Sequence, residues 1–413
     1  MDTPAFWLLP FAALLLSIAV LPLAVPGRWG RPGFQALVAG LAALPVALGR
    51  PGAVGRVAPE YVSFVLLLGS LYVVTSGIRV TGDIPAHPAT NVGLLLIGGV
   101  LASVIGTTGA SMLLIRLVLE VNSERKNVSH TVLFFILVVS NAGGCLTPLG
   151  DPPLFLGYLA GVPFFWTLRL APIWGLTLAA LLGTYFLVDL RRYAEEPREA
   201  IRADETTLRP IRVSGLWNLP LLGGIVAGTA FLEFPYREAA YLACAGLSFP
   251  LTPRGQRAET RFSWHPILEV AILFAGIFVA MEPALAVLRE RAPTLGLIRP
   301  WQFFWATGAL SAWLDNAPTY AAFFALARGL GRPEVAGVPA KVLEAISTGA
   351  VFFGALTYIG NGPNFLVRSI AISRGVAMPS FFGYAARAAV VLLPLFMLIT
   401  FLFFAWPGTL PPP

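Results

Sequence analysis

Twelve long apolar segments, separated by short clusters of Pro, Gly and Arg, follow one another along the 413-residue chain. A helix needs about 20 apolar residues to cross the hydrocarbon core of a bilayer, so segments of this length predict membrane-spanning or interrupted helices. The composition agrees, because 57% of the residues are hydrophobic and 12% are charged, whereas soluble domains carry about 25% charged residues. We therefore predict an all-α polytopic membrane protein, and this composition excludes a water-soluble enzyme.

The segments form two halves of the same layout, joined by a polar stretch. We expect them near 5–25, 33–49, 60–78, 91–119, 130–159 and 165–188, and then near 215–233, 237–251, 264–288, 300–327, 340–368 and 381–406. The stretch 189–214 holds six acidic residues and six arginines, which is typical of a solvated linker. The predicted organisation is an N-terminal transmembrane repeat at 1–188, a linker at 189–214 and a C-terminal repeat at 215–413.

Two sequence motifs support an internal duplication. Residues 144–156 (GCLTPLGDPPLFL) align without gaps on residues 354–366 (GALTYIGNGPNFL), with seven of thirteen positions identical at an offset of 210. Upstream of each copy lies a second small polar knot, GTTGAS at 106–111 and LDNAPT at 314–319. Self-similarity at a fixed offset is the signature of a repeat, so each half is expected to contain the same set of elements.

Each knot interrupts an apolar segment with residues that do not suit a continuous helix. Irregular backbone at membrane depth is tolerated only where it is buried in protein or lines a wet cavity. We therefore predict re-entrant hairpins at 91–119 and 300–327, and crossing helices broken at the knot at 130–159 and 340–368. Each repeat then has three spans, a hairpin, a broken helix and a final span, which makes five crossings. An odd number of crossings inverts the second repeat relative to the first.

The basic residues predict the orientation. The net charge is +7, but these residues lie in short connectors with no dense run, so we expect no nucleic acid partner. With the N-terminus outside, seventeen of the 28 basic residues fall on the side of the linker and nine on the opposite side. Cytoplasmic loops carry the excess of Lys and Arg. The linker 189–214 is therefore expected in the cytoplasm, and the chain in a plasma membrane, which in a bacterium is the inner membrane.

Asp151 and Asp315 are the acidic residues that fall inside the polar knots. A carboxylate at membrane depth costs about 2.5–3.5 kcal/mol on insertion scales, so its presence is a functional hypothesis by default. Interrupted segments at matching positions of two halves are also the best sequence indication of a transporter binding site. The alternative is that each aspartate only caps the half-helix that follows it.

Other side chains in the knots offer the hard oxygen ligands that hard cations prefer. They are Thr107, Thr108, Ser111, Ser140, Asn141 and Thr147 in the first half, and Asn316, Thr319, Thr357, Asn361 and Asn364 in the second. For Na⁺ we expect Asp151, Asn141 and Thr147 as ligands. An aspartate that holds either a proton or Na⁺ exchanges one ion for the other, so the residues predict Na⁺(Li⁺)/H⁺ antiport. These ions are transported, and no cofactor is expected.

The pairing of SNAGGCLTPLGD at 140–151 with LDNAP at 314–318 resembles the ion transporter superfamily, and within it the NhaD-type sodium/proton antiporters. The resemblance covers nearly the whole chain. It implies that Asn141, Asp151 and Asp315 belong to the ion-translocating set, and that the protein is a homodimer with a scaffold and a mobile transport domain. The first knot has Thr107 and Thr108 where NhaD-type proteins tend to carry an acidic residue, and the two prolines after Asp151 are closer to arsenite permeases.

Other functions remain open on the same fold. Relatives labelled citrate transporter-like make an anion permease for citrate, another carboxylate or arsenite the main alternative. An anion site favours positive charge and half-helix N-termini. The knots instead contribute two aspartates, and Arg116 of the predicted first hairpin is at best one basic candidate. An intramembrane aspartyl protease is disfavoured, because Pro148 replaces the first glycine of its glycine-x-glycine-aspartate pattern. We expect no enzyme activity. A passive channel is a further alternative, since sequence does not reveal coupling.

Overall fold

The computed structural model describes residues 3–206, 208–260, 262–331 and 334–405, and over these residues the chain is mainly helical. Within them, seven helices are long and apolar enough to cross a membrane. The prediction of an all-α polytopic membrane protein is therefore confirmed, while the inversion of the second repeat stays a prediction. The ends of the predicted segment 381–406 and of the predicted C-terminal repeat lie outside the described residues.

The helices follow the predicted order. The first half contains α1 (Leu8–Ala24), α2 (Pro26–Trp29), α3 (Pro32–Gly49), α4 (Gly52–Ser76), α5 (Pro88–Ile105), α6 (Thr107–Val121), α7 (Ser129–Val138), α8 (Pro152–Leu159) and α9 (Ala171–Ala194). After α10 (Arg198–Thr206), the second half contains α11 (Asn218–Phe231), α12 (Tyr236–Leu251), α13 (Gln256–Glu259), α14 (His265–Arg291), α15 (Pro300–Ser311), α16 (Asn316–Arg328), α17 (Ala340–Phe353), α18 (Gly362–Ser373) and α19 (Phe381–Ile399). Helix α11 has 14 residues and is shorter than the expected segment 215–233, whereas α12 with 16 residues matches the expected segment 237–251.

All four segments that carry a polar knot are broken at the knot. Gly106 separates α5 from α6 with φ of 82°, a conformation that glycine adopts without steric cost. The other three breaks lie between α7 and α8, between α15 and α16, and between α17 and α18. Pro152 and Pro363 lie in the first turns of α8 and α18, where the missing N–H of proline costs nothing. The chain thus restarts a helix directly after each of these two breaks.

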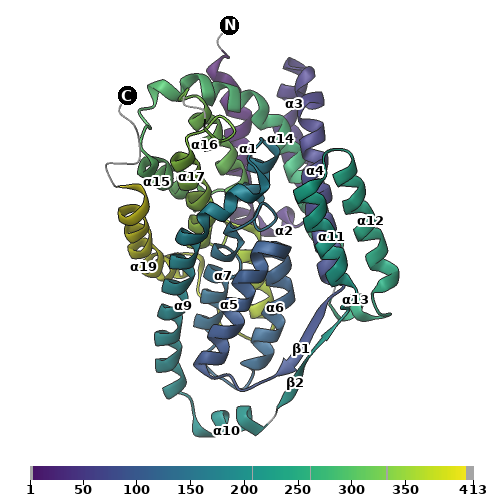
Figure 1. The fold of residues 1–413 in the computed structure, drawn as a ribbon, viewed down its shortest axis with the longest axis vertical. Coiled ribbons are helices and arrows are strands. Elements are labelled where there is room, and N and C mark those ends of the chain that lie inside the picture. The colour runs from purple at the N-terminus through teal and green to yellow at the C-terminus, as the bar shows by residue number, and fades with distance from the viewer. Residues whose placement is uncertain (1–2, 207, 261, 332–333, 406–413) are drawn as a thin grey trace.

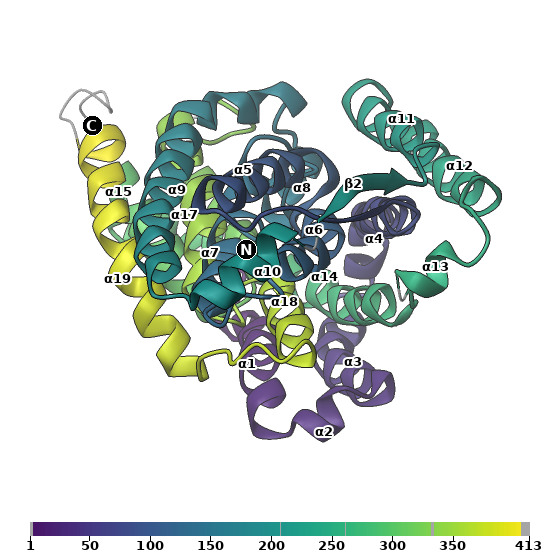
Figure 2. The same cartoon turned by 90° about the horizontal axis from the view of Figure 1, so that it is seen from below.

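The helices form two groups that lie side by side. Figure 2 shows α3, α4, α11, α12 and α14 toward one side, and α9, α15, α17 and α19 toward the other. The broken helices and the hairpins α5/α6 and α15/α16 belong to the second group. Helix α14 packs on α16, and α4 packs on α6 and α8. The breaks therefore lie where the interrupted helices meet α4 and α14.

The linker is more ordered than its composition predicts. It contains α10 and the strand β2 (Arg209–Ser214), which pairs antiparallel with β1 (Arg79–Asp83), with Arg79 opposite Ser214. All residues of β2 are exposed, so no apolar alternation marked it in the sequence. Figure 1 shows this ribbon crossing between the two helix groups. We call the end of the molecule that carries β1, β2 and α10 the linker end.

Asp189 corrects the predicted start of the linker. Helix α9 continues to Ala194, and the Asp189 side chain is fully buried. Its Oδ1 lies 2.6 Å from Arg125 Nη2 and 2.8 Å from His130 Nε2. Asp189 follows Tyr185 by four positions on the buried face of α9, so the helical period would have identified it. These two contacts join α9 to the connection between α6 and α7 and to the first turn of α7, at the linker end.

We predict that Asp189→Ala lowers the stability of the protein by about 3–5 kcal/mol, because it leaves the buried Arg125 guanidinium without its carboxylate. The apparent melting temperature in detergent measures the effect. Glu195→Ala is the matched control, since it removes an exposed carboxylate that pairs with Arg192 three residues away, and exposed pairs contribute little. Equal melting temperatures for the two variants would contradict the prediction.

Candidate functional site

Asp151 lies at the centre of the interrupted helices and is 1% exposed. Its Oδ1 accepts hydrogen bonds from Thr107 Oγ1 at 2.8 Å and from Asn361 Nδ2 at 3.1 Å. Its Oδ2 accepts a hydrogen bond from Asn316 Nδ2 at 2.6 Å. Thr107 begins α6, Asn316 begins α16 and Asn361 precedes α18. One carboxylate therefore joins all four breaks, and two of its donors come from the opposite half of the chain.

A chain of amides extends this contact between the halves. Asn361 Nδ2 donates to Asn141 Oδ1 at 3.3 Å and to the Ser140 carbonyl oxygen at 3.0 Å. Asn141 Nδ2 donates in turn to Asn364 Oδ1 at 2.7 Å. Asn364 Nδ2 donates to the carbonyl oxygens of Gly354 and Thr357. We call Asp151, Thr107, Asn316, Asn361, Asn141 and Asn364 the polar hub.

The remaining predicted site residues mainly hold the backbone of the breaks. The hydroxyls of Thr147, Thr357 and Thr319 donate to the carbonyl oxygens of Ser103, Ala312 and Asp315, and Ser111 Oγ lies 2.8 Å from Ser140 Oγ. Thr147 thus contacts backbone rather than the hub carboxylate, and its role as a Na⁺ ligand stays a prediction. Ser103, which sequence reasoning missed, donates to the Gly143 carbonyl oxygen and accepts from the Leu146 N–H.

Asp315 occupies the N-cap of α16, and its Oδ1 accepts from the Ala317 N–H at 3.0 Å. The capping alternative is therefore realised for this residue. Asp151 also holds the N-cap position, of α8, but its side chain makes no capping hydrogen bond. The two aspartates differ accordingly: Asp315 binds its own helix, while Asp151 binds side chains of three other segments.

A cavity of about 120 Å³ lies beside the hub, between the breaks and helices α4 and α14. The first residues of four half-helices line it, namely Thr107 and Thr108 of α6, Pro152 of α8, Asn316 of α16, and Gly362 and Pro363 of α18. Tyr72, Phe274 and other apolar side chains of α4 and α14 form the opposite wall. Asp315 also lines this cavity, and the described lining contains no basic side chain.

Helix N-termini carry unpaired N–H groups and a partial positive charge, and they are established anion sites. The broken-helix architecture brings four of them to one cavity, which sequence reasoning missed because it had no geometry for the half-helices. Among the described residues, no group of three or more His, Cys, Asp or Glu forms a metal site. The cavity thus combines the Asp315 carboxylate with four helix N-termini, and the buried Asp151 lies beside it.

The breaks of the interrupted helices meet at a buried polar hub beside a cavity. This is the architecture of a secondary transporter. A family model described as "Putative citrate transport" matches residues 1–404. The chain therefore belongs to this citrate transporter-like family of ion transporters. A search of curated proteins found no match to the chain.

The backbones of Gly144 and Gly150 pack against each other within the break between α7 and α8. We predict that Gly150→Ala prevents proper folding. A Cβ atom at Gly150 would lie 2.1 Å from the Gly144 carbonyl oxygen, far inside van der Waals contact. We expect a strong loss of monodisperse protein in detergent and a lower melting temperature. Gly362→Ala is the control at the same cavity, because a Cβ there meets nothing within 4 Å. A Gly150→Ala protein as stable as this control would contradict the close approach of the two backbones.

Proposed function

We propose that the protein is a secondary transporter of citrate or a related polycarboxylate, driven by Na⁺ or H⁺. The anion would occupy the cavity at the half-helix N-termini, and the coupling cation would bind at Asp151. We also propose that the linker end faces the cytoplasm, in agreement with the distribution of basic residues. Assembly as a homodimer, which the family resemblance implies, stays a prediction.

The convergence of four helix N-termini on one cavity carries this proposal. Each N-terminus acts as about +0.5 elementary charge, so the four together contribute about +2 and offset the two carboxylates Asp151 and Asp315. The sequence-based objection to an anion substrate weighed two aspartates against Arg116, without the positions of the helix ends. With the helix ends included, the cavity is less negative than its carboxylates alone indicate. The first N–H groups of Thr107, Leu154 and Asn364 are already bonded within the chain, so the helix ends would act on an anion mainly through their dipoles.

Coupling to a cation follows from the same balance between the charge of the helix ends and that of the carboxylates. An ionised carboxylate has about four lone-pair positions, and three donors reach Asp151, which leaves room for a proton or for a rearranged cation site. A Na⁺ ion or proton at Asp151 removes one negative charge beside the cavity, so the potential there favours the anion more strongly. Linkage is reciprocal, so a bound anion favours cation binding by the same factor.

The Na⁺/H⁺ antiport expected from sequence receives no support from the family match, which favours the citrate alternative. Antiport also leaves the four helix ends at the cavity without a use. The two functions differ in one observable. Citrate transport moves a polycarboxylate substrate across the membrane, whereas Na⁺/H⁺ antiport proceeds without any such substrate.

The central test is uptake of labelled citrate into proteoliposomes with an imposed Na⁺ or H⁺ gradient. We expect gradient-driven uptake by the natural protein and its loss in Asp151→Asn, which keeps the shape of the side chain but removes its charge. Glu195→Gln is the control, since Glu195 is an exposed residue at the end of α9, and it should transport normally.

The same vesicles separate the alternatives. Dissipation of a pre-formed pH gradient by Na⁺ or Li⁺ without any carboxylate would replace the proposal with antiport. Uptake of arsenite but not citrate would change the substrate class. Uptake without accumulation under any gradient would indicate a passive channel.

A charge placed at the cavity tests the anion directly. Thr108 is exposed in the first turn of α6 and lines the cavity. We predict that Thr108→Glu raises the citrate KM about tenfold or more, equivalent to about 1.4 kcal/mol, because the new carboxylate occupies the helix end and repels the substrate. Thr108→Gln, of equal size but neutral, should change the KM much less. A Thr108→Glu variant with the KM of the glutamine variant would show that the anion binds elsewhere.

A further inference from the structure

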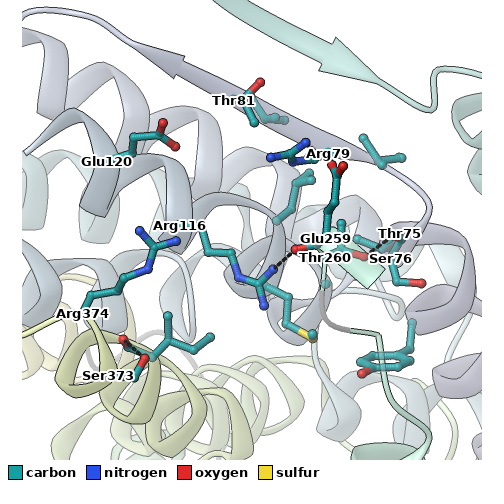
Figure 3. Close-up of a pocket in the computed structure, with 17 residues that line it drawn as sticks. Thr75, Ser76, Arg79, Thr81, Arg116, Glu120, Glu259, Thr260, Ser373 and Arg374 are labelled. Atoms are coloured by element: carbon teal, nitrogen blue, oxygen red, sulfur yellow. Dashed lines mark hydrogen bonds and ion pairs between the residues drawn. The ribbon is translucent and has the colours of Figure 1, made fainter. Parts of the chain in front are cut away.

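A second cavity of about 190 Å³ opens between the polar hub and the linker end. Tyr72 and Gly109 line both cavities, so the second one adjoins the first directly. Its walls come from α4, β1, α6 and the end of α18, and Figure 3 shows the side chains that project into it. We call this second cavity the antechamber.

The antechamber is basic, unlike the cavity at the hub. Three guanidinium groups, those of Arg79, Arg116 and Arg374, line it together with the carboxylates of Glu120 and Glu259. Each carboxylate is engaged by an arginine, because Glu259 pairs with Arg79 and Glu120 Oε1 lies 3.7 Å from Arg209 Nη1 on β2. Arg116 and Arg374 add two further guanidinium groups to the lining, and Figure 3 shows both side chains beside the space.

The two arginines stand on the helices that begin at the hub. Arg116 lies nine positions after Thr107 in α6, which is about 13 Å along a helix. It donates from Nη1 to the Glu259 carbonyl oxygen at 3.3 Å. Arg374 is the exposed C-cap residue of α18, the helix whose first residue Gly362 lines the hub cavity. An anion that leaves the helix N-termini toward the linker end therefore meets these guanidinium groups next.

We propose that the antechamber is a second binding site for the transported polycarboxylate, in which Arg116 and Arg374 bind its carboxylate groups on the linker side of the hub. This inference rests on the proposed function. Guanidinium groups bind carboxylates in two-pronged, charge-assisted contacts. Among the described residues, the buried Thr75 hydroxyl on the same wall has no hydrogen-bond partner, so it supplies a further donor. A positively charged entrance also concentrates the anion and raises its rate of association.

Sided transport kinetics test the site. Citrate uptake is measured in right-side-out vesicles and in everted vesicles, which present the external face and the linker face respectively. We expect Arg374→Gln to raise the citrate KM about three- to tenfold at the linker face, in the range of a charged hydrogen bond partly exposed to water. The KM at the external face should change less than twofold. Arg374→Lys, which keeps the charge but loses the two-pronged contact, should give an intermediate KM at the linker face.

Arg254→Gln is the matched control, because Arg254 is an exposed arginine that follows α12 and does not line the antechamber. Arg116→Gln should act like Arg374→Gln, but it also removes the contact with the Glu259 carbonyl, so the exposed Arg374 carries the test if that variant does not fold. An unchanged KM at the linker face in Arg374→Gln, or an equal rise at both faces, would overturn the second site while citrate transport itself stands. Failure of the natural protein to transport citrate from either face would instead overturn the proposed function.

Discussion

A buried carboxylate in a membrane protein must be supplied with donors, and the arrangement around Asp151 follows from this requirement. Thr107, Asn316 and Asn361 reach it from three other segments, and none of the three is a sequence neighbour. Loss of a partner of a buried charge costs several kcal/mol, so the hydrogen bonds fix where the breaks can lie relative to one another. The two halves of the chain are thereby locked at their centres, while helices such as α1 and α3 leave most of their apolar surface exposed.

The same breaks that supply these donors also determine the electrostatics of the cavity. Each half-helix that restarts after a break directs the positive end of its dipole toward the cavity. Four restarts at one cavity partly offset the carboxylate of Asp315, which lines it, and that of the buried Asp151 beside it. A cation bound at Asp151 would then make the potential in the cavity more favourable to an anion. A balanced site of this kind suits coupled transport better than a strongly charged one, which would hold its ligand too tightly to release it.

The breaks were predictable from sequence, whereas their mutual contacts were not. Gly106, the knot before Pro152 and the knot before Pro363 conflict with continuous helices in lipid, so local sequence identified them. The contact of Asp151 with Asn316 spans 165 residues, and nothing local to either residue indicates it. The positive ends of the half-helices at the cavity could not be predicted either, because the directions of the half-helices do not follow from composition. Strand β2 was missed because its residues are all exposed, and Asp189 because the charged sequence around it concealed a continuing helical period.

The order of charges along the molecule follows from how α6 and α18 are placed. Both helices have their N-termini at the hub and extend toward the linker end, so an anion passing along them leaves the positive helix ends and moves toward the negative ones. The C-terminal ends of helices disfavour anions, and a path without compensation would oppose release in that direction. Arg116 and Arg374 lie along this path, where they offset the unfavourable ends of the helices. Basic side chains near the ends of α6 and α18 are therefore a physical requirement if an anion is to use the linker side of the hub.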